Sequence, residues 1–469
     1  MPRDKADQKT YWKCSKKDCG FTWATKLLDD GSCVVEPERK DKRHNHPLEP
    51  KQTPIPGSSD APNILWIGIP EAGNNIAMQR FTSLCFSREG NEIIPDFDMD
   101  EVLPLKKFLG KGFVADAGAD NDPVIHQSVI TMAYAKRNLG VHVEFRNWNW
   151  VHRTIEKPDF IPDQLAEHAL VIFLSTTIDD SPKGTLSIQS FYEKIQLLAM
   201  QHGHMRIYPN TQEMQQDHFK IGDIRVLDMI ARNSPERFRF RPRTCFGSGI
   251  CTLQGEGNQS VVKKSHSCGG NGVEVLVIEE ARKKVGCYLE TRQKAMRATP
   301  RMSQVGPGNP ILLHQEYIAT LLGFGEFRVF LQAPPHPTGP AKIMAIALTK
   351  FEALGGRMVA RHILPEDFSG AGENEESWKE KEIELRHFAC HIYTQLCARL
   401  DANEVYESLK IGVRLDIGIS VLDPIGQFFV NEITRWHSAD FLSMDILRYP
   451  FLEICKGYSA AWSAFLRRL

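Results

Sequence analysis

The chain has 469 residues, of which 42% are apolar and 25% are charged, and its formal net charge at pH 7 is −1. This composition indicates a globular protein of about two to four domains and excludes long disorder. A net charge so close to zero excludes a global attraction to nucleic acid or membranes, so any such affinity must be local. Eleven cysteines, most of them scattered singly, indicate a reducing compartment. Without a signal-like start or a long apolar run, we expect a nuclear or cytoplasmic protein with no membrane partner.

The first 50 residues carry two cysteines and two histidines at the spacing of a small metal-binding module. Cys14 and Cys19 precede His44 and His46 in the pattern Cys-x4-Cys-x24-His-x-His. So short a segment cannot build a large core, and in such modules a tetrahedral Zn²⁺ supplies the folding energy. Between the two ligand pairs, short strands are expected around a turn, at residues 21–25 and 32–35.

This segment resembles the FLYWCH and WRKY-type zinc fingers in its ligand spacing, in the aromatic residues before the first cysteine and in its terminal His-x-His. The heptad that defines WRKY domains is absent, so the resemblance favours the FLYWCH-like branch. It implies a Zn²⁺ ion on Cys14, Cys19, His44 and His46, and DNA as a partner. Residues 1–51 carry 12 Lys or Arg against 9 Asp or Glu, which supports phosphate contacts locally. Protein binding stays open as the alternative.

Residues 51–62 are rich in proline, glycine and serine, and are expected to form a linker. From residue 63 onward, apolar segments with strand character alternate with segments of helical pattern. The expected strands lie at residues 64–69, 141–145, 170–174 and 205–209. Strands that alternate with helices predict a small open α/β domain over residues 63–210, followed by a helix that reaches Lys220.

The middle of the chain carries a pattern suited to binding phosphate. A strand at residues 260–264 leads into a loop of glycine and serine, where glycines allow backbone amides to turn toward an anion and hydroxyls add donors. The lysine before the loop adds a point charge. These residues are Lys263, Ser265, Ser267, Gly269, Gly270 and Gly272. The loop is not of the Walker type, and a flexible hairpin is the alternative interpretation.

Near the end of the chain, two strands are predicted to form a hairpin. In the first, residues 413–421, apolar residues alternate with Arg414 and Asp416, which places both charges on one face. After a turn at residues 423–426, the second strand brings back Glu432. Buried carboxylates and a guanidinium are costly unless they pair or bind an ion, and this set suits Mg²⁺ with a polyphosphate. A surface hairpin with solvated charges is the alternative.

The order of these segments resembles the ATP-grasp superfamily, in its D-alanine–D-alanine ligase and glutamate-ligase-like style. A strand ending in Gln-Glu-Tyr-Ile at residues 315–318 and one reading Gly-Glu-Phe-Arg at 325–328 complete the pattern. The resemblance covers about residues 63–440. It implies an α/β (α+β) fold, with a small α/β domain before an ATP-grasp domain over residues 211–469 that includes C-terminal helices.

The resemblance also implies ATP and Mg²⁺ as cofactors and a role for each matching residue. Besides the loop, the contacts to nucleotide phosphates would come from Lys220 and Lys263. The edge of the adenine would be met by Glu316 and by the backbone of Tyr317 and Ile318, with Gln315 beside them. The γ-phosphate or a substrate carboxylate would be bound by Arg328 and Arg414. The magnesium ligands would be Asp416, Glu432 and Thr434, although the family usually has an asparagine in place of Thr434.

The implied reaction joins a small carboxylate to an amine. The carboxylate attacks the γ-phosphate of ATP, and the amine displaces phosphate from the resulting acyl phosphate. We therefore expect a ligase that forms a C–N bond, fused to a zinc finger. The alternative is a DNA-binding regulator whose ATP-grasp domain senses nucleotide without ligation, and Thr434 and the finger favour it.

Overall fold

The computed structural model describes part of the chain, and the structural statements below concern this part. The described residues are 9–13, 22–27, 33–37, 64–69, 115–117, 122–124, 131, 134–135, 143–147, 170–173, 197, 200, 206–210, 212–213, 220–246, 253, 259–265, 273–298, 311–336, 339–352, 357–364, 367–368, 375–399, 402–422, 426–439 and 450–466. Within the chain, contacts define two compact units, Met1–Asp60 and Ala61–Leu469. No helix in the described ranges combines the length and the hydropathy that crossing a bilayer requires.

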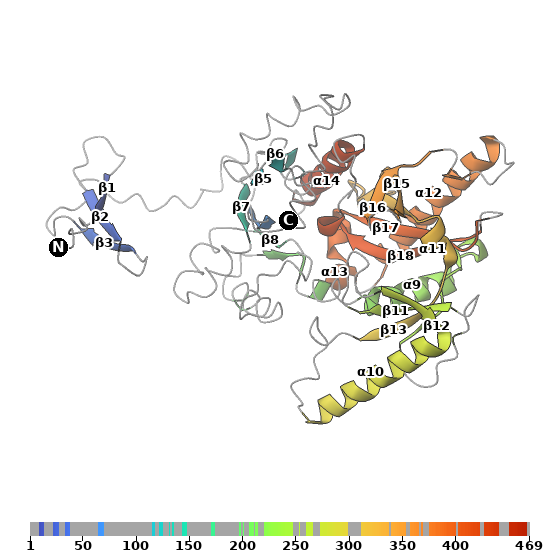
Figure 1. Cartoon of the computed structure of the whole chain (residues 1–469). Helices are drawn as coiled ribbons and strands as arrows, with labels where there is room; N and C mark the ends of the chain where they lie inside the picture. Colours follow the sequence, from blue (N-terminus) through green and yellow to red (C-terminus); the bar gives the residue numbers. More distant parts are fainter. Residues whose placement is uncertain are drawn as a thin grey trace. The chain divides into compact units, whose positions relative to one another are not determined.

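The first unit contains a three-stranded antiparallel sheet (Figure 1). Its strands follow in chain order: β1 (Lys9–Lys13), β2 (Thr22–Leu27) and β3 (Cys33–Pro37). The two strands predicted between the cysteines and the histidines are therefore present, as β2 and β3. The predicted zinc ligands Cys14, Cys19, His44 and His46 lie outside the described residues.

The second unit begins with a parallel sheet in the order β7-β4-β8-β9. Its strands are β4 (Ile64–Ile69), β7 (Val143–Asn147), β8 (Leu170–Phe173) and β9 (Arg206–Tyr208). All four coincide with predicted strands, and the parallel order agrees with the predicted open α/β sheet. A small antiparallel pair, β5 (Ala115–Ala117) and β6 (Asp122–Val124), was not predicted.

A four-stranded antiparallel sheet follows, in the order β10-β13-β11-β12. Its strands are β10 (Thr244–Cys245), β11 (Gln259–Lys264), β12 (Val273–Val277) and β13 (Leu312–Glu316). One face packs on α10 (Ile278–Ala298) through Val262, Ala281, Val285 and Leu312. The helix α9 (Ile221–Asn233) and the short η4 (Glu236–Phe238) precede this sheet, so Lys220 lies at the start of α9.

The largest sheet is antiparallel, in the order β16-β15-β14-β17-β18. Its strands are β14 (Glu326–Gln332), β15 (Lys342–Glu352), β16 (Arg357–His362), β17 (Gly412–Ile419) and β18 (Phe428–Arg435). The predicted hairpin is confirmed as β17 and β18. The remaining elements are α11 (Ala319–Gly323), α12 (Glu375–Cys397), α13 (Ala402–Val405), η8 (Glu407–Lys410), η9 (Trp436–Ser438) and α14 (Phe451–Leu466).

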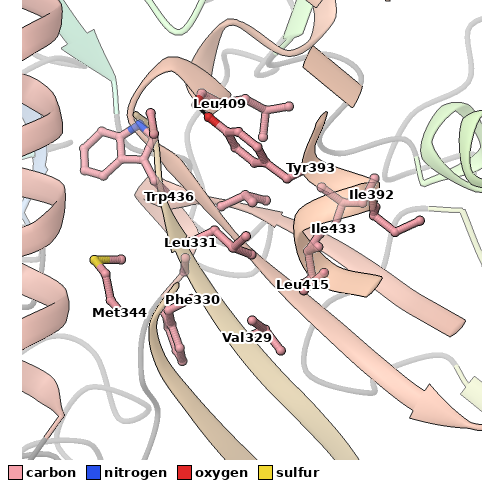
Figure 2. Packing of buried hydrophobic residues seen from close by; sticks show 14 of the residues in the cluster. Val329, Phe330, Leu331, Met344, Ile392, Tyr393, Leu409, Leu415, Ile433 and Trp436 are labelled. Atoms are coloured by element: carbon pink, nitrogen blue, oxygen red, sulfur yellow. Dashed lines mark hydrogen bonds between the residues drawn. The ribbon is translucent and has the colours of Figure 1, made fainter. Parts of the chain in front are cut away.

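The main core forms on the apolar face of the large sheet. Leu415 of β17 and Ile433 of β18 lie opposite each other in the register and pack with Val329 of β14 (Figure 2). Ile392 and Tyr393 of α12 belong to the same buried cluster. The strict alternation of β17 thus buries its apolar residues against a helix, and its polar residues must occupy the other face.

The other face of the large sheet is covered at one end by α14. A Cβ atom on Gly412 of β17 would collide with the ring of Tyr458, and one on Gly457 would collide with Met344 of β15. Both glycines permit helix and sheet to approach closely. Further along the same face lie the charged side chains described next.

Candidate functional site

Three charged side chains form one row across the large sheet. Arg328 of β14 lies opposite Asp416 of β17, and Asp416 lies opposite Glu432 of β18. Arg328 and Asp416 are buried, and Nε of Arg328 lies 4.0 Å from Oδ1 of Asp416. The Nε and Nη1 atoms of Arg328 make no hydrogen bond with any described residue. A buried guanidinium with such donors can accommodate an anionic oxygen.

Arg414 lies two residues before Asp416 on β17, next to this row, and holds Asp416 with two parallel hydrogen bonds. Its Nε donates to Oδ1 over 2.7 Å and its Nη2 to Oδ2 over 2.8 Å. Nη2 also donates to Oγ1 of Thr434 over 3.1 Å. Burial alone would lower the pKa of Arg414, but Asp416 outweighs it, and the pKa is raised above its usual value. The guanidinium thus stays charged, and it occupies oxygens that were predicted to bind metal.

A β-bulge in β18 brings two successive side chains to the site. Asp416 pairs with Glu432 and Ile417 pairs with Val430, so Asn431 is the additional residue. In a regular strand Asn431 and Glu432 would point to opposite faces, and a bulge removes that restriction. Nδ2 of Asn431 donates to Oε2 of Glu326 over 3.0 Å. Glu326 lies two residues before Arg328 on β14, hence on the same face.

Two lysines from other elements meet this part of β18. Nζ of Lys263, from β11 of the smaller sheet, donates to Oδ1 of Asn431 over 3.2 Å. Nζ of Lys220, at the start of α9, lies 3.0 Å from Oε1 of Glu432. The backbone N–H of Lys220 donates to the carbonyl of Ser265 over 3.1 Å. Residues far apart in the sequence are therefore brought to one cluster of charges.

The electrostatics of the cluster follow from burial and from these neighbours. Burial, together with the charge of Lys220, lowers the pKa of Lys263 to about 8. Burial also raises the pKa of Glu326, and the nearby Asp416 adds to this. Burial would raise the pKa of Glu432 as well, but Lys220, Arg414 and Lys263 together lower it. Glu432 is therefore held as a carboxylate beside the cations.

The predicted phosphate loop joins β11 to β12. Lys263 lies opposite Val273 in the register, so the loop leaves and rejoins the sheet beside this lysine. Ser265 is buried, and its Oγ accepts a hydrogen bond from the backbone N–H of Ile311 over 2.8 Å. The remaining predicted loop residues, Ser267, Gly269, Gly270 and Gly272, lie outside the described residues.

The residues predicted to meet a nucleobase lie at the end of β13. Gln315 is opposite Val261, two residues before Lys263 on β11, and its Nε2 donates to Oγ1 of Thr244 over 2.9 Å. The carboxylate of Glu316 accepts from the backbone N–H of Arg243 over 3.0 Å. It also lies 3.3 Å from Nη2 of the same arginine. Tyr317 and Ile318 follow directly, between β13 and α11.

Three residues of the cluster were not predicted as site residues: Glu326, Asn431 and Arg241, whose charge acts on Lys263. For Glu326 a signal was available, since strand alternation places it on the face of Arg328. Asn431 reaches the site only through the bulge, which no residue pattern announces. Arg241 donates through Nε to Oδ1 of Asp228 over 3.2 Å and through Nη1 to the carbonyl of Val430, contacts distant in the sequence.

The chemistry of the donors fits Mg²⁺ carried by phosphate. Among the described residues, no group of three or more His, Cys, Asp or Glu side chains is placed to hold a metal ion. Protein sites for Mg²⁺ commonly supply only one or two carboxylates, and substrate phosphates and waters supply the rest. Asp416 and Glu432 lie opposite each other in the register, which provides such a pair.

Comparisons with known proteins give distant similarities. No family model matches the sequence, and no curated protein matches it. A crystal structure of a D-cycloserine synthetase is similar over 86% of this chain and 100% of its own length, with 12% identity and a TM-score of 0.42. An ATP-grasp RimK-domain protein from Sphaerobacter thermophilus aligns over 71% of this chain and 94% of its own, with 10% identity and a TM-score of 0.39. The structure of D-alanyl-alanine synthetase A from Vibrio cholerae aligns over 85% of this chain and 98% of its own, with 10% identity and a TM-score of 0.38.

Proposed function

We propose that this chain is an ATP- and Mg²⁺-dependent ligase of the ATP-grasp type, which joins a small carboxylate to an amine. The observation that carries the proposal is the meeting of Lys220 and Lys263 with the row of Arg328, Asp416 and Glu432. Cations that surround a pair of carboxylates suit a nucleotide whose phosphates carry a metal ion.

In this proposal the two lysines bind the phosphates. In the structure each lysine is paired with a side chain of β18, Lys220 with Glu432 and Lys263 with Asn431. Phosphate oxygens would replace these partners or share the lysines with them. The glycine- and serine-rich loop beside Lys263 would add backbone and hydroxyl donors, as its composition predicts.

An apolar surface next to Lys263 is our proposed platform for the nucleobase. Val273, Val275 and Val277 are 40 to 43% exposed, although they are large aliphatic residues in a strand. Val275 lies opposite Val261 in the register, and Val273 lies opposite Lys263, so all of them share one face. Gln315, and the backbone of the residues that follow it, would meet the edge of the base.

The metal would be held by Asp416 and Glu432, with the amide oxygen of Asn431 nearby. Mg²⁺ would neutralise charge on the phosphates during phosphoryl transfer. The protein's own cations have two tasks here. Arg328 and Arg414 orient the substrate carboxylate or the γ-phosphate, and they stabilise negative charge as it develops, an effect of about 3 kcal/mol per donor.

The proposal is tested by ADP release in the presence of ATP, Mg²⁺ and a panel of carboxylates and amines. We expect turnover that depends on both substrates. Asp416→Asn and Lys263→Ala should abolish it while circular dichroism stays unchanged, because asparagine keeps an oxygen acceptor for Arg414 and Lys263 lies outside the main core. Turnover at the wild-type rate in both variants would refute the assignment.

A nucleotide sensor without ligase activity is the second candidate. One contact favours it. The Thr434 hydroxyl accepts a hydrogen bond from Arg414, although the resemblance implied that Thr434 is a metal ligand. Under this alternative the wild-type protein binds Mg·ATP but releases no ADP with any substrate pair. A titration of the wild-type protein with Mg·ATP, together with the ADP-release assay, therefore separates the two candidates.

For residues 1–50 we propose a zinc site on Cys14, Cys19, His44 and His46 and a role in binding DNA. The antiparallel strands β1–β3 supply a small scaffold, and the spacing of the ligands supports the metal. The expected result is one bound zinc per chain, lost in Cys14→Ser, and salt-dependent binding to duplex DNA. Zinc content equal to wild type in Cys14→Ser would contradict this site.

A further inference from the structure

A second ion pair joins α9 to β18, next to the pair of Lys220 with Glu432. Asp223 follows Lys220 by three residues, and Arg435 follows Glu432 by three residues. Both terminal nitrogens of Arg435 donate to the carboxylate of Asp223, with 3.0 Å between Nη2 and Oδ1. The side chain of Arg435 is 0% exposed and that of Asp223 is 9% exposed. The start of the helix is therefore attached to the strand at two points.

Other elements fix this second pair in place. The hydroxyl of Tyr406 donates to Oδ1 of Asp223 over 2.8 Å, and the guanidinium of Arg435 lies 5.2 Å from the centre of the Tyr406 ring. Oε1 of Glu213 lies 3.6 Å from Nε of Arg435. Glu213 in turn accepts from the backbone N–H of Ser408 over 2.8 Å. Such a buried network costs free energy to assemble and holds its members in one arrangement.

Arg435 cannot touch a ligand at the phosphate site. It lies opposite Val413 in the register, so it belongs to the apolar face of the sheet, whereas Glu432 belongs to the charged face. The side-chain contacts of Arg435 lead to the site through α9, because its hydrogen-bond partner Asp223 lies one turn after Lys220. Since Lys220 is the N-cap residue of that helix and Asp223 lies in its first turn, the position of Lys220 against Glu432 depends on where Asp223 is held.

We propose that Arg435 and Asp223 are positioning residues, which set the place of Lys220 against Glu432 and thereby the affinity for a nucleotide's phosphates. This inference rests on the proposed function, because it concerns the same site. The pair resembles an outer-shell contact of a metal site, where a residue that touches no ligand orients one that does. A structural role alone would change stability and leave the phosphate site as it is.

The test compares Arg435→Lys with a matched control, Arg361→Lys. Arg361 of β16 also holds a buried aspartate, Asp367, with two parallel hydrogen bonds, and we assign it no part in the site. Lysine keeps the charge but loses the paired donors. We expect Arg435→Lys to weaken Mg·ATP binding by about tenfold, within the range of outer-shell effects. Arg361→Lys should lower the melting temperature and leave the dissociation constant unchanged.

A second background shows whether the effect passes through Lys220. In Lys220→Ala, the same Arg435→Lys change should no longer alter the dissociation constant, because the group that it positions is absent. An undiminished loss of affinity in that background overturns the proposal, and so does wild-type affinity in Arg435→Lys alone. If Arg435→Lys does not fold, Tyr406→Phe removes only the hydroxyl that holds Asp223 and serves for the same comparison.

A measurement without nucleotide separates this inference from the proposed function. The labelling rate of Lys220 by an amine reagent, followed by peptide mass spectrometry, reports how firmly Glu432 holds it. We expect faster labelling in Arg435→Lys and an unchanged rate in Arg361→Lys. If the wild-type protein binds no Mg·ATP, the proposed function fails, and the labelling still decides the positioning role. Equal rates in wild type and Arg435→Lys would overturn it.

Discussion

Lys263 is the residue of the site whose charge state is most sensitive to its surroundings. Burial and the neighbouring Lys220 lower its pKa to about 8, from a usual value of 10.5. The ammonium is therefore charged at neutral pH and loses its proton in mildly alkaline solution. In the free protein the same shift makes folding more favourable as pH rises from about 8 to 10.5, because the unfolded chain binds the proton more tightly.

The affinity for Mg·ATP should fall as pH rises from 7 to 9. Phosphate binding requires the charged ammonium, so above pH 8 binding must take up about one proton. Lys263→Arg stays charged throughout, and we expect it to flatten the profile. Calorimetric titration at pH 8.5 in two buffers of different ionisation enthalpy measures the proton uptake. The same slope in Lys263→Arg would show that another group is responsible.

Sequence reasoning worked for residues whose neighbours are set by strand alternation and failed for those set by tertiary contacts. Arg414 and Asp416 were predicted to share a face, and they do. The closeness of Lys263 to Glu432 came from a family resemblance and not from any local pattern. Asn431 was missed because the bulge follows from pairing with β17. The pair of Asp223 with Arg435 joins positions more than two hundred residues apart.

At the scale of elements, β17 is the strand that packs against helices on both of its faces. Its apolar residues face α12, and its Gly412 approaches α14. A hydrogen bond between α12 and η8 adds to this, since the Tyr393 hydroxyl donates to the carbonyl of Leu409 over 2.7 Å. The charged row is thus built on a strand whose position is fixed from both sides, which favours a rigid site.

Replacing the two close-contact glycines should have unequal effects. A Cβ on Gly412 would meet the backbone carbonyl of Leu331 as well as the ring of Tyr458, and a backbone cannot move away cheaply. We expect Gly412→Ala to lower the free energy of unfolding by about 2 kcal/mol, as overpacking does. Gly457→Ala should cost less than about 1 kcal/mol, because Met344 is flexible and alanine favours a helix. Urea unfolding of both variants measures the difference, and equal losses would contradict this reasoning.

The exposed valines of β12 allow a test of the nucleobase platform. Val275→Asp should weaken Mg·ATP binding by about tenfold, since it removes an apolar contact and adds a negative charge near phosphates. Stability should change little, because Val275 is already 43% exposed. Leu364→Asp, at an equally exposed residue after β16, is the matched control and should bind as wild type does. Unchanged affinity in Val275→Asp would place the base elsewhere.

Some elements were predicted from periodicity and others were not. Apolar residues at helical spacing predict a long helix over residues 375–400, and the structure contains it as α12, which ends at Cys397. The spacing places Ile383, Leu385 and Phe388 on its apolar side. Ile383 is 52% exposed, whereas Leu385 and Phe388 are buried. The helix α10 was not predicted. Most of its residues are polar or charged, and the buried apolar residues among its described side chains are Ile278, Ala281 and Val285, so its hydrophobic pattern in the sequence is weak.

At the scale of the whole molecule, the chain consists of two units with separate tasks in our account. Residues 61–469 contain every residue of the proposed phosphate site, and residues 1–60 contain every proposed zinc ligand. Sequence composition alone indicated the proline-rich segment near this boundary. It could not show how the four-stranded antiparallel sheet and the five-stranded sheet are brought together at the site, because that follows from long-range contacts.

A fragment of residues 61–469 should therefore bind Mg·ATP with the affinity of the full chain. Adding a zinc chelator should change the spectroscopic signal of the full chain but not that of the fragment. Calorimetry and circular dichroism on both proteins make the comparison. Loss of nucleotide binding in a folded fragment would show that the first unit contributes to the site.

The most direct test of the account is the equilibrium binding of ATP with and without Mg²⁺, measured for the wild type, Lys263→Ala and Glu432→Gln. We predict saturable binding that requires Mg²⁺ and is weakened at least tenfold in each variant, since an ion pair or hydrogen bond to a charged group contributes about 1.5–3 kcal/mol. Binding of wild-type strength in both variants, or no binding in the wild type, would contradict the claim that the two sheets hold one metal-bound nucleotide.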